Sequence, residues 1–200
     1  MTELPFSQAC ENNKNPILAV LRDWLPADGT MLEIGAGTAQ HAVYFAKHLP
    51  TWQWLPTDHP EAVAGVNQRI HQAGLANLAS ATALDLHDWS KSQAGTLDAA
   101  FSANTAHIVD WQGVEAMFHG VGCGLKPGGL FLLYGPFRYN GEHTAESNAR
   151  FDEMLRSRDP ASGIRDLADI EPLARRAGLI LRDDVAMPAN NRVLVWQSTS

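Results

Sequence analysis

The 200-residue chain has little cysteine, few basic side chains and no long apolar run. Its two cysteines, Cys10 and Cys123, lie far apart and form no C-x-x-C pair, so neither a disulfide framework nor a zinc ribbon is predicted. Lys and Arg number 15 against 22 Asp and Glu, and the net charge of −7 argues against sequence-independent binding to nucleic acid or anionic membranes. A small-molecule ligand is therefore the default expectation.

Targeting and membrane segments are also missing from the sequence. Residues 1–6 contain neither a basic region nor an apolar stretch, so no secretory signal is predicted there. No stretch approaches the roughly 20 apolar residues that a membrane-spanning helix needs. We therefore expect a cytoplasmic protein. A hydrophobic fraction of 45% is ample for one core, so a single domain is expected over residues 1–200.

Strand-like and helix-like apolar periods alternate along the chain. This alternation predicts a β-α-β-α-β order with parallel strand pairing and right-handed crossovers. An N-terminal arm, residues 1–28, is expected to be irregular as far as residue 14 and to start its helix at Asn15-Pro16. The other expected elements are strand 30–34, a helix to about 49, strand 52–57, helix 60–73, strand 79–85, strand 97–104, a helix ending at 125, a sharp turn at 126–129, strand 130–134, helix 166–177 and an antiparallel strand pair, 179–186 with 192–197.

Residues 137–165 interrupt this pattern, because they are polar and contain few large apolar side chains. A partly ordered insert of this kind after a central strand suits a lid over the strand ends. We therefore expect residues 137–165 to form a lid.

The most informative stretch is Glu33-Ile34-Gly35-Ala36-Gly37-Thr38, where an apolar strand breaks into glycines before a helix. Gly35 and Gly37 lack a Cβ, so the backbone can take positive φ there and approach a ligand closely. The dinucleotide pattern G-x-G-x-x-G is nearly present but ends on Gln40, and there is no Gly-Lys-Ser/Thr, which excludes a P-loop. The turn alone is a weak signal.

Three carboxylates strengthen this signal, because Glu33, Asp58 and Asp85 end three successive predicted strands. The carboxyl ends of parallel strands line the crevice where ligands bind, so the three should surround one molecule. Glu33 would repel the pyrophosphate of a dinucleotide. S-adenosylmethionine carries a sulfonium, an ammonium and no phosphate, and it is the cofactor that this charge pattern favours.

The assembly resembles class I S-adenosylmethionine-dependent methyltransferases, through the glycine stretch, the two later acids and Lys126-Pro127-Gly128-Gly129. The resemblance implies a Rossmann-like α/β fold: a seven-stranded, mostly parallel sheet with helices on both faces and an antiparallel C-terminal hairpin. More narrowly, nearly the whole chain is similar to a methyltransferase-like family long catalogued as a domain of unknown function. The matching residues are Glu11, Asn13, Lys14, Pro16, Ile17, Gly37, Thr38, Gln40, His41, Asn104, His107, Ile108, 134–136, 163–166 and 187–191. Ala39 departs from the methyltransferase pattern, which usually has glycine there.

Individual roles follow for the cofactor. We expect Glu33 to compensate the ammonium, Asp58 to accept both ribose hydroxyls, and Asp85 with the Leu86 backbone N–H to bind adenine. The alternatives are an exposed strand-end carboxylate for Glu33, a helix cap for Asp58, a capping turn for Asp85 and a surface or packing role for His41. The full set of predicted cofactor-binding residues is Glu33, Gly35, Ala36, Gly37, Thr38, His41, Asp58, Asp85, Leu86 and Asn104.

Asn104 and His107 follow the fourth predicted strand and are the predicted catalytic residues. A neutral imidazole could remove a proton from an attacking O–H or N–H, although a structural histidine is the alternative for His107. The predicted substrate-binding residues are Lys14, Tyr134, Arg165, Asn190 and Asn191; Tyr134 is alternatively a plain strand residue, and Lys14 part of a solvated arm. The eight histidines show no metal-binding spacing, so no metal site is expected.

The leading hypothesis is an enzyme that transfers the sulfonium methyl in line to a small-molecule acceptor, with S-adenosylhomocysteine as product. The alternative is a non-catalytic S-adenosylmethionine-binding sensor or partner subunit, and the cofactor site alone does not separate the two. A nicotinamide-dependent reductase is disfavoured by Glu33 and by the lack of a Tyr-x-x-x-Lys pair. The sequence leaves the acceptor and the oligomeric state open.

Overall fold

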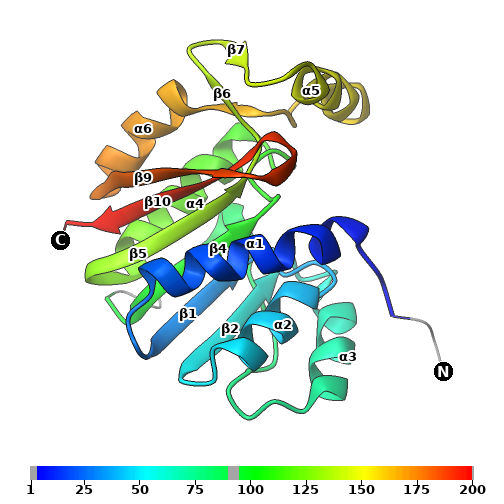
Figure 1. Cartoon of the computed structure of the whole chain (residues 1–200), viewed down its shortest axis with the longest axis vertical. Coiled ribbons are helices and arrows are strands. Elements are labelled where there is room, and N and C mark those ends of the chain that lie inside the picture. The colour runs from blue at the N-terminus through cyan, green and yellow to red at the C-terminus, as the bar shows by residue number, and fades with distance from the viewer. Residues whose placement is uncertain (1–3, 90–94, 200) are drawn as a thin grey trace.

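The computed structural model describes residues 4–89 and 95–199, so residues 1–3 of the expected N-terminal arm, residues 90–94 and Ser200 lie outside the described part of the chain. Seven strands form one sheet in the order β3-β2-β1-β4-β5-β10-β9 (Figure 1). These strands are β1 (Gly29–Ile34), β2 (Trp52–Asp58), β3 (Thr82–Ala83), β4 (Leu97–Ala103), β5 (Leu125–Gly135), β9 (Leu179–Met187) and β10 (Asn191–Ser198).

The strand directions agree with the fold class that the sequence predicts. β1 pairs in parallel with β2 and β4, and β4 pairs in parallel with β5, whereas β10 is antiparallel to both β5 and β9. Strand order reverses between β1 and β4. Their carboxyl ends therefore meet at the switch point of an open α/β sheet, the usual position of a ligand crevice.

Helices cover both faces of the sheet. The α1, α2 and α3 side packs around Phe45, Trp54 and Phe101, while the α4 and α6 side packs around Phe118 and Trp196. The helices are α1 (Gln8–Trp24), α2 (Gln40–His48), α3 (Val63–Ala73), α4 (Trp111–Gly124), α5 (Glu146–Arg158) and α6 (Leu167–Arg176), with short 3-10 turns η1 (Leu86–Asp88) and η2 (Pro188–Asn190).

The predicted start of the first helix is wrong. α1 begins at Gln8, because the Ser7 side chain caps it by accepting a hydrogen bond from the Cys10 N–H, and Pro16 lies inside the helix. The first polar residues of α1 form hydrogen bonds with α2; Glu11, for example, accepts from Gln40 at 2.7 Å. An amphipathic period alone could not reveal a helix turn whose contacts are polar.

Two strand predictions also need correction. The third strand, expected over 79–85, is reduced to Thr82–Ala83, because the side chain of Asn67 bonds both the N–H and the carbonyl of Ala81. The sharp turn expected at 126–129 lies within β5, where the pairing with β4 shifts register. Gly128, with φ of 79°, takes up that irregularity.

The insert is more ordered than its composition predicts. Residues 137–166 form β6 (Phe137–Tyr139), β7 (Glu142–His143), α5 and β8 (Arg165–Asp166), and the three strands make a small sheet in the order β7-β6-β8. Buried Asp152 organises this segment, since it accepts a hydrogen bond from the Ile164 N–H at 2.7 Å. Figure 1 places β6, β7 and α5 beyond the ends of β5 and of the β9–β10 hairpin.

A matched pair of helical glycines tests how closely α4 and α6 pack. A Cβ built on Gly122 would lie 2.1 Å from the Ala177 carbonyl oxygen, whereas nothing lies within 4 Å of a Cβ on Gly65. Gly122→Ala should therefore lower the free energy of unfolding by about 1–3 kcal/mol. Gly65→Ala should raise it by roughly 0.5–1 kcal/mol, because alanine favours the helix. Urea denaturation measures both; equal stabilisation of the two variants would contradict close contact between these helices.

Candidate functional site

The glycine turn after β1 is fastened to the end of β2. The N–H groups of Gly35 and Ala36 donate to the Thr57 carbonyl at 3.0 and 2.9 Å, and the Gly37 N–H donates to Asp58 Oδ2 at 2.6 Å. Gly35 has φ of 75°, and a Cβ there would lie 2.5 Å from Thr105 Oγ1. Glycine is required at this position both by the backbone conformation and by the close approach of β4's following loop.

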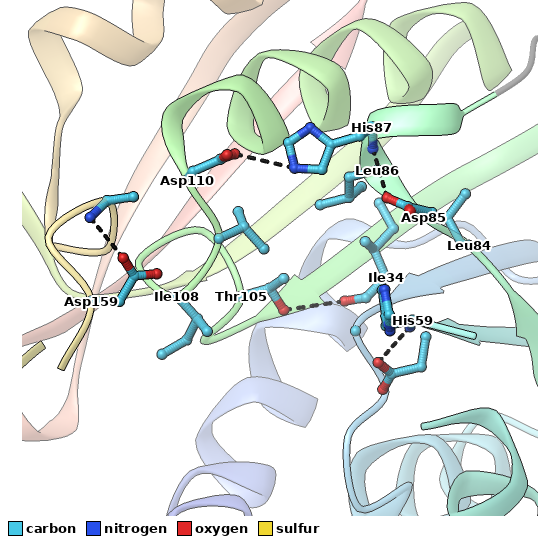
Figure 2. Close-up of a pocket in the computed structure, with 14 residues that line it drawn as sticks. Ile34, His59, Leu84, Asp85, Leu86, His87, Thr105, Ile108, Asp110 and Asp159 are labelled. Atoms are coloured by element: carbon cyan, nitrogen blue, oxygen red, sulfur yellow. Dashed lines mark hydrogen bonds and ion pairs between the residues drawn. The ribbon is translucent and has the colours of Figure 1, made fainter. Parts of the chain in front are cut away.

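A cavity of about 410 Å³ opens beside this turn, at the carboxyl ends of β1, β2 and β4 (Figure 2). It holds four of the predicted cofactor-binding residues together: Gly35, Asp58, Asp85 and Leu86. Its other lining residues are Ile34, His59, Leu84, His87, Thr105, Ile108, Val109, Asp110, Asp159 and Ala161. None of these described lining residues is Lys or Arg, so the cavity has no fixed cation for a phosphate group.

Asp58 and Asp85 already have backbone partners. Asp58 accepts from the Gly37 N–H and, at 2.7 Å, from the His59 N–H. Asp85 caps η1 by accepting from the His87 N–H at 2.9 Å. The capping role given as an alternative for Asp85 is therefore present, and a carboxylate still has further acceptor sites that can face the cavity.

Several lining residues have no role in the sequence prediction. Thr105 and Ile108 follow predicted Asn104, and Ile108 is unusual for a large apolar side chain in being 51% exposed. Asp110 caps α4, accepting from the Gly113 N–H at 2.7 Å. Asp159, from the loop after α5, reaches the cavity from the insert. The position of Thr105 just after a strand end could have suggested it as a cavity residue. No local feature of the sequence marks Asp159 as one.

Glu33 is buried on β1 and does not line this cavity. Its Oε2 accepts a hydrogen bond from the Trp54 indole N–H at 2.6 Å. Burial raises the pKa of Glu33 to about 8, and the charge of Asp58 adds to this effect, while the Trp54 hydrogen bond opposes it. Glu33 is therefore largely protonated at neutral pH in this structure.

Gln40 and His41, the first residues of α2, hold α1 through Glu11 and Asn13. Thr38 donates its hydroxyl to Gln40 at 2.9 Å, and the ring of buried His41 lies 2.6 Å from Asn13 Oδ1. Burial lowers the pKa of His41 to about 4, so the ring is neutral. These contacts fit the packing role that was the alternative for His41.

Tyr134 continues this buried polar group at the end of β5. Burial raises the pKa of its hydroxyl, and hydrogen bonds with Asn13 and Asn191 oppose that rise. The group thus joins α1, β5 and the β9–β10 loop. His41, Asn13, Tyr134 and Asn191 come from separate parts of the sequence and form one hydrogen-bonded network here. No single sequence motif could predict it.

Asn104 and His107 lie together on the loop after β4. Asn104 has φ of 59° and donates its N–H to the Tyr134 carbonyl at 2.9 Å. His107 is 5% exposed, and its ring meets Phe151 edge to face. Burial, with a smaller effect of the Arg165 charge, lowers the pKa of His107 to about 4, so this imidazole is a weak base.

Arg165 is buried behind the same loop. Its Nε donates to the Ala106 carbonyl at 2.9 Å. Its Nη2 donates to the Ala161 carbonyl at 2.9 Å and also to the Val109 carbonyl. The guanidinium also lies 5.9 Å from the Trp111 ring. Its hydrogen bonds therefore fix the loop, and direct contact with a substrate stays a prediction.

Three other predicted substrate residues have local contacts. Lys14 pairs with Glu11 and lies 5.0 Å from the Tyr44 ring centroid. The Asn190 carbonyl accepts from Asn148 at 3.0 Å, and Asn191 bonds the Pro188 carbonyl at 3.3 Å. Among the described residues no group of three or more His, Cys, Asp or Glu could hold a metal ion, and no helix is long and apolar enough to cross a bilayer.

Residues 4–198 match the family described as "Protein of unknown function (DUF938)". The chain belongs to the DUF938 family. This match covers nearly all of the chain, in line with the resemblance predicted from the sequence.

Solved structures of low sequence identity share the fold of this DUF938 protein. An O-methyltransferase family protein from Burkholderia thailandensis is 17% identical over 96% of the chain with a TM-score of 0.80. The S-adenosylmethionine-dependent methyltransferase SibL is 22% identical over 96% of the chain, with a TM-score of 0.78. Human N-acetylserotonin methyltransferase is 15% identical over 96% of the chain, with a TM-score of 0.77. The chain spans 58%, 56% and 53% of their lengths. The fold is thus that of class I methyltransferases.

Glu33→Gln tests whether the buried carboxyl is neutral in the folded protein. The pKa of about 8 in the folded protein lies above the ordinary glutamate value of 4.5. The stabilising effect of the protonated Glu33 is therefore fully present below pH 4.5 and is lost as pH rises through 8. Between pH 6.5 and 8.5 the wild type should lose on the order of 1 kcal/mol per pH unit through this group, and Glu33→Gln should not. Thermal unfolding across this range measures the difference; parallel pH profiles would contradict a neutral Glu33.

Proposed function

We propose that this DUF938 protein binds S-adenosylmethionine and transfers its methyl group to a small-molecule acceptor. The observation that carries the proposal is the cavity at the switch point, where Gly35, Asp58 and Asp85 converge from three strand ends. Ligands of open α/β sheets bind at this position. The human and calicheamicin-pathway structures that share the fold are described as complexes with S-adenosylmethionine and its product S-adenosylhomocysteine, which supports this ligand.

The lining of the cavity fits the adenosine part of that molecule. Asp58 would accept the ribose hydroxyls, while Asp85 and the Leu86 N–H would bind the adenine edge. Leu84 and Val109 offer apolar surface to the ring. The absence of Lys and Arg from the described lining disfavours the pyrophosphate of a dinucleotide, which four aspartates would repel.

The methionine part would extend along the glycine turn. Ala36, Gly37 and Thr38 would follow it with their backbone, with His41 behind them and Asn104 facing from β4. Glu33 would compensate the ammonium group directly or through water, and the arriving charge would favour its ionised form. Its buried carboxyl accepts from Trp54 alone among the described residues, which leaves acceptor capacity for such a contact.

The bound cofactor would supply an electrophilic methyl group on its sulfonium. The chain's own contribution is then to exclude water and to orient the acceptor with Asn104 and His107. Tyr134, Asn190 and Asn191 would bound the acceptor side, with Lys14 near the entrance. Arg165 would act by holding the loop that carries His107. Residues 137–165 would cover the site as a lid of the single domain, since Asp159 and Ala161 reach the cavity wall.

A small acceptor is favoured over a macromolecule. The net charge of −7 is unsuited to nucleic acid, and the shared-fold structures include enzymes of small-molecule chemistry, such as the mitomycin 7-O-methyltransferase. We infer a small-molecule acceptor for this chain too.

Asp58→Ala tests the cofactor site. It should weaken S-adenosylhomocysteine binding by about 1–3 kcal/mol, because buried hydroxyl donors lose their acceptor. Asp183→Ala, at an exposed position of β9, should leave affinity unchanged. Titration calorimetry measures both variants, with NAD as a competing ligand and circular dichroism as the check on folding. Tighter binding of NAD than of S-adenosylmethionine by the wild type would overturn the proposed function.

A further inference from the structure

Gly135, the last residue of β5, is a glycine that the backbone does not require. Its φ lies outside the left-handed region, and it is buried opposite Arg192 in the β10 pairing. A Cβ built on it would make only ordinary van der Waals contacts, the nearest at 3.5 Å. An alanine would therefore fit without moving the strand, and its methyl group would occupy the space beside the loop after β4.

Two polar atoms converge on that space. A methyl group on Gly135 would lie 3.5 Å from His107 Nδ1 and 4.0 Å from Asn104 Oδ1. These atoms come from the loop after β4, which is held from two sides. The Asn104 N–H donates to the Tyr134 carbonyl, and the His107 carbonyl accepts from the Gly163 N–H at 2.9 Å. The gap beside Gly135 is thus bordered by these two polar atoms, and a methyl group on Gly135 would contact both.

A buried positive charge lies behind the same loop. The Arg165 guanidinium donates to the carbonyls of Ala106 and Val109, on either side of His107. Among the described residues Arg165 has no carboxylate within ion-pair distance; Asp152 and Asp110 act on it only through longer-range charge, as do Arg156 and Arg138. The field at His107 is therefore positive, and the ring stays neutral.

We propose that the gap at Gly135, between Asn104 and His107, receives the nucleophilic atom of the methyl acceptor, and that this atom is the oxygen or sulfur of a hydroxyl or thiol group. The proposal rests on the proposed function, because it needs a methyl donor in the neighbouring site. The sequence leaves open whether the acceptor is an O–H or an N–H group, and this proposal excludes the N–H group.

A hydroxyl or thiol acceptor and an amine acceptor develop opposite charges during methyl transfer. A hydroxyl or thiol in the gap would lose its proton to bulk solvent, and its oxygen or sulfur would form the new bond to the methyl carbon. The bond between that carbon and the sulfonium sulfur of the cofactor would break, with its electron pair left on the cofactor's sulfur. Partial negative charge on the acceptor is stabilised by nearby Arg165. An amine would instead develop positive charge beside a buried guanidinium, which is unfavourable. Neutral His107 and Asn104 Oδ1 orient the group by hydrogen bonding.

Gly135→Ala is the test of location, with Gly65→Ala as the matched control, since its Cβ meets nothing within 4 Å. Each protein is incubated with methyl-labelled S-adenosylmethionine and a metabolite extract, and labelled products are identified by mass spectrometry. Gly135→Ala should keep its melting temperature and bind S-adenosylhomocysteine within about twofold of wild type, yet form roughly 100-fold less product. Gly65→Ala should match the wild type in S-adenosylhomocysteine binding and in the amount of product.

A binding readout completes the experiment without turnover. The demethylated form of the identified product is titrated into each protein saturated with S-adenosylhomocysteine, where the wild type should bind it and Gly135→Ala should not. A methyl ether, ester or thioether as product supports the acceptor class, and a methylamine overturns it. Equal product from Gly135→Ala and wild type overturns the location. If the wild type binds the cofactor but forms no labelled product, the whole inference is overturned. If the wild type does not bind the cofactor, the proposed function itself is overturned.

Discussion

The hydrogen bonds from the glycine turn to the end of β2 are the constraint on which the site depends. Gly35 and Ala36 donate to Thr57, and Gly37 donates to Asp58, so the turn, the second strand and one cavity carboxylate form a single unit. Because a Cβ on Gly35 would meet Thr105, the same turn also sets the position of the loop after β4. The cavity exists because three strand ends are held in this register.

Burial then decides the charge of the groups around it. Glu33, His41 and His107 all lie where desolvation favours the neutral form, with pKa values of about 8, 4 and 4. The carboxylates Asp58 and Asp85 stay at the more open cavity wall, and the guanidinium of Arg165 is buried behind His107. Carboxylates therefore line the cavity, while the buried positive charge lies behind His107. This difference in charge underlies the assignment of the cofactor to the cavity and of the acceptor to the side of His107.

Much of the fold followed from sequence, and the errors share one cause. The strand and helix periods predicted the parallel pairing of the first strands and the closing hairpin. Of the three carboxylates predicted to surround one ligand, Asp58 and Asp85 line the cavity, whereas Glu33 is buried beside it and does not. The start of α1, the short β3 and the order in residues 137–166 were missed, because polar side chains such as Asn67 and Asp152 bond distant backbone there. Gly135 appeared in the sequence only as part of the matching run 134–136, because its closeness to His107 and Asn104 is visible only in the folded chain.

A crystal structure of the protein with S-adenosylhomocysteine tests the central claim most directly. The account predicts a ligand in the cavity with its ribose hydroxyls on Asp58, its adenine edge on Asp85 and Leu86, and its amino group on the Glu33 side of the glycine turn. Gly135 should remain open between Asn104 and His107. A ligand bound elsewhere, or a ribose turned away from Asp58, would contradict the account.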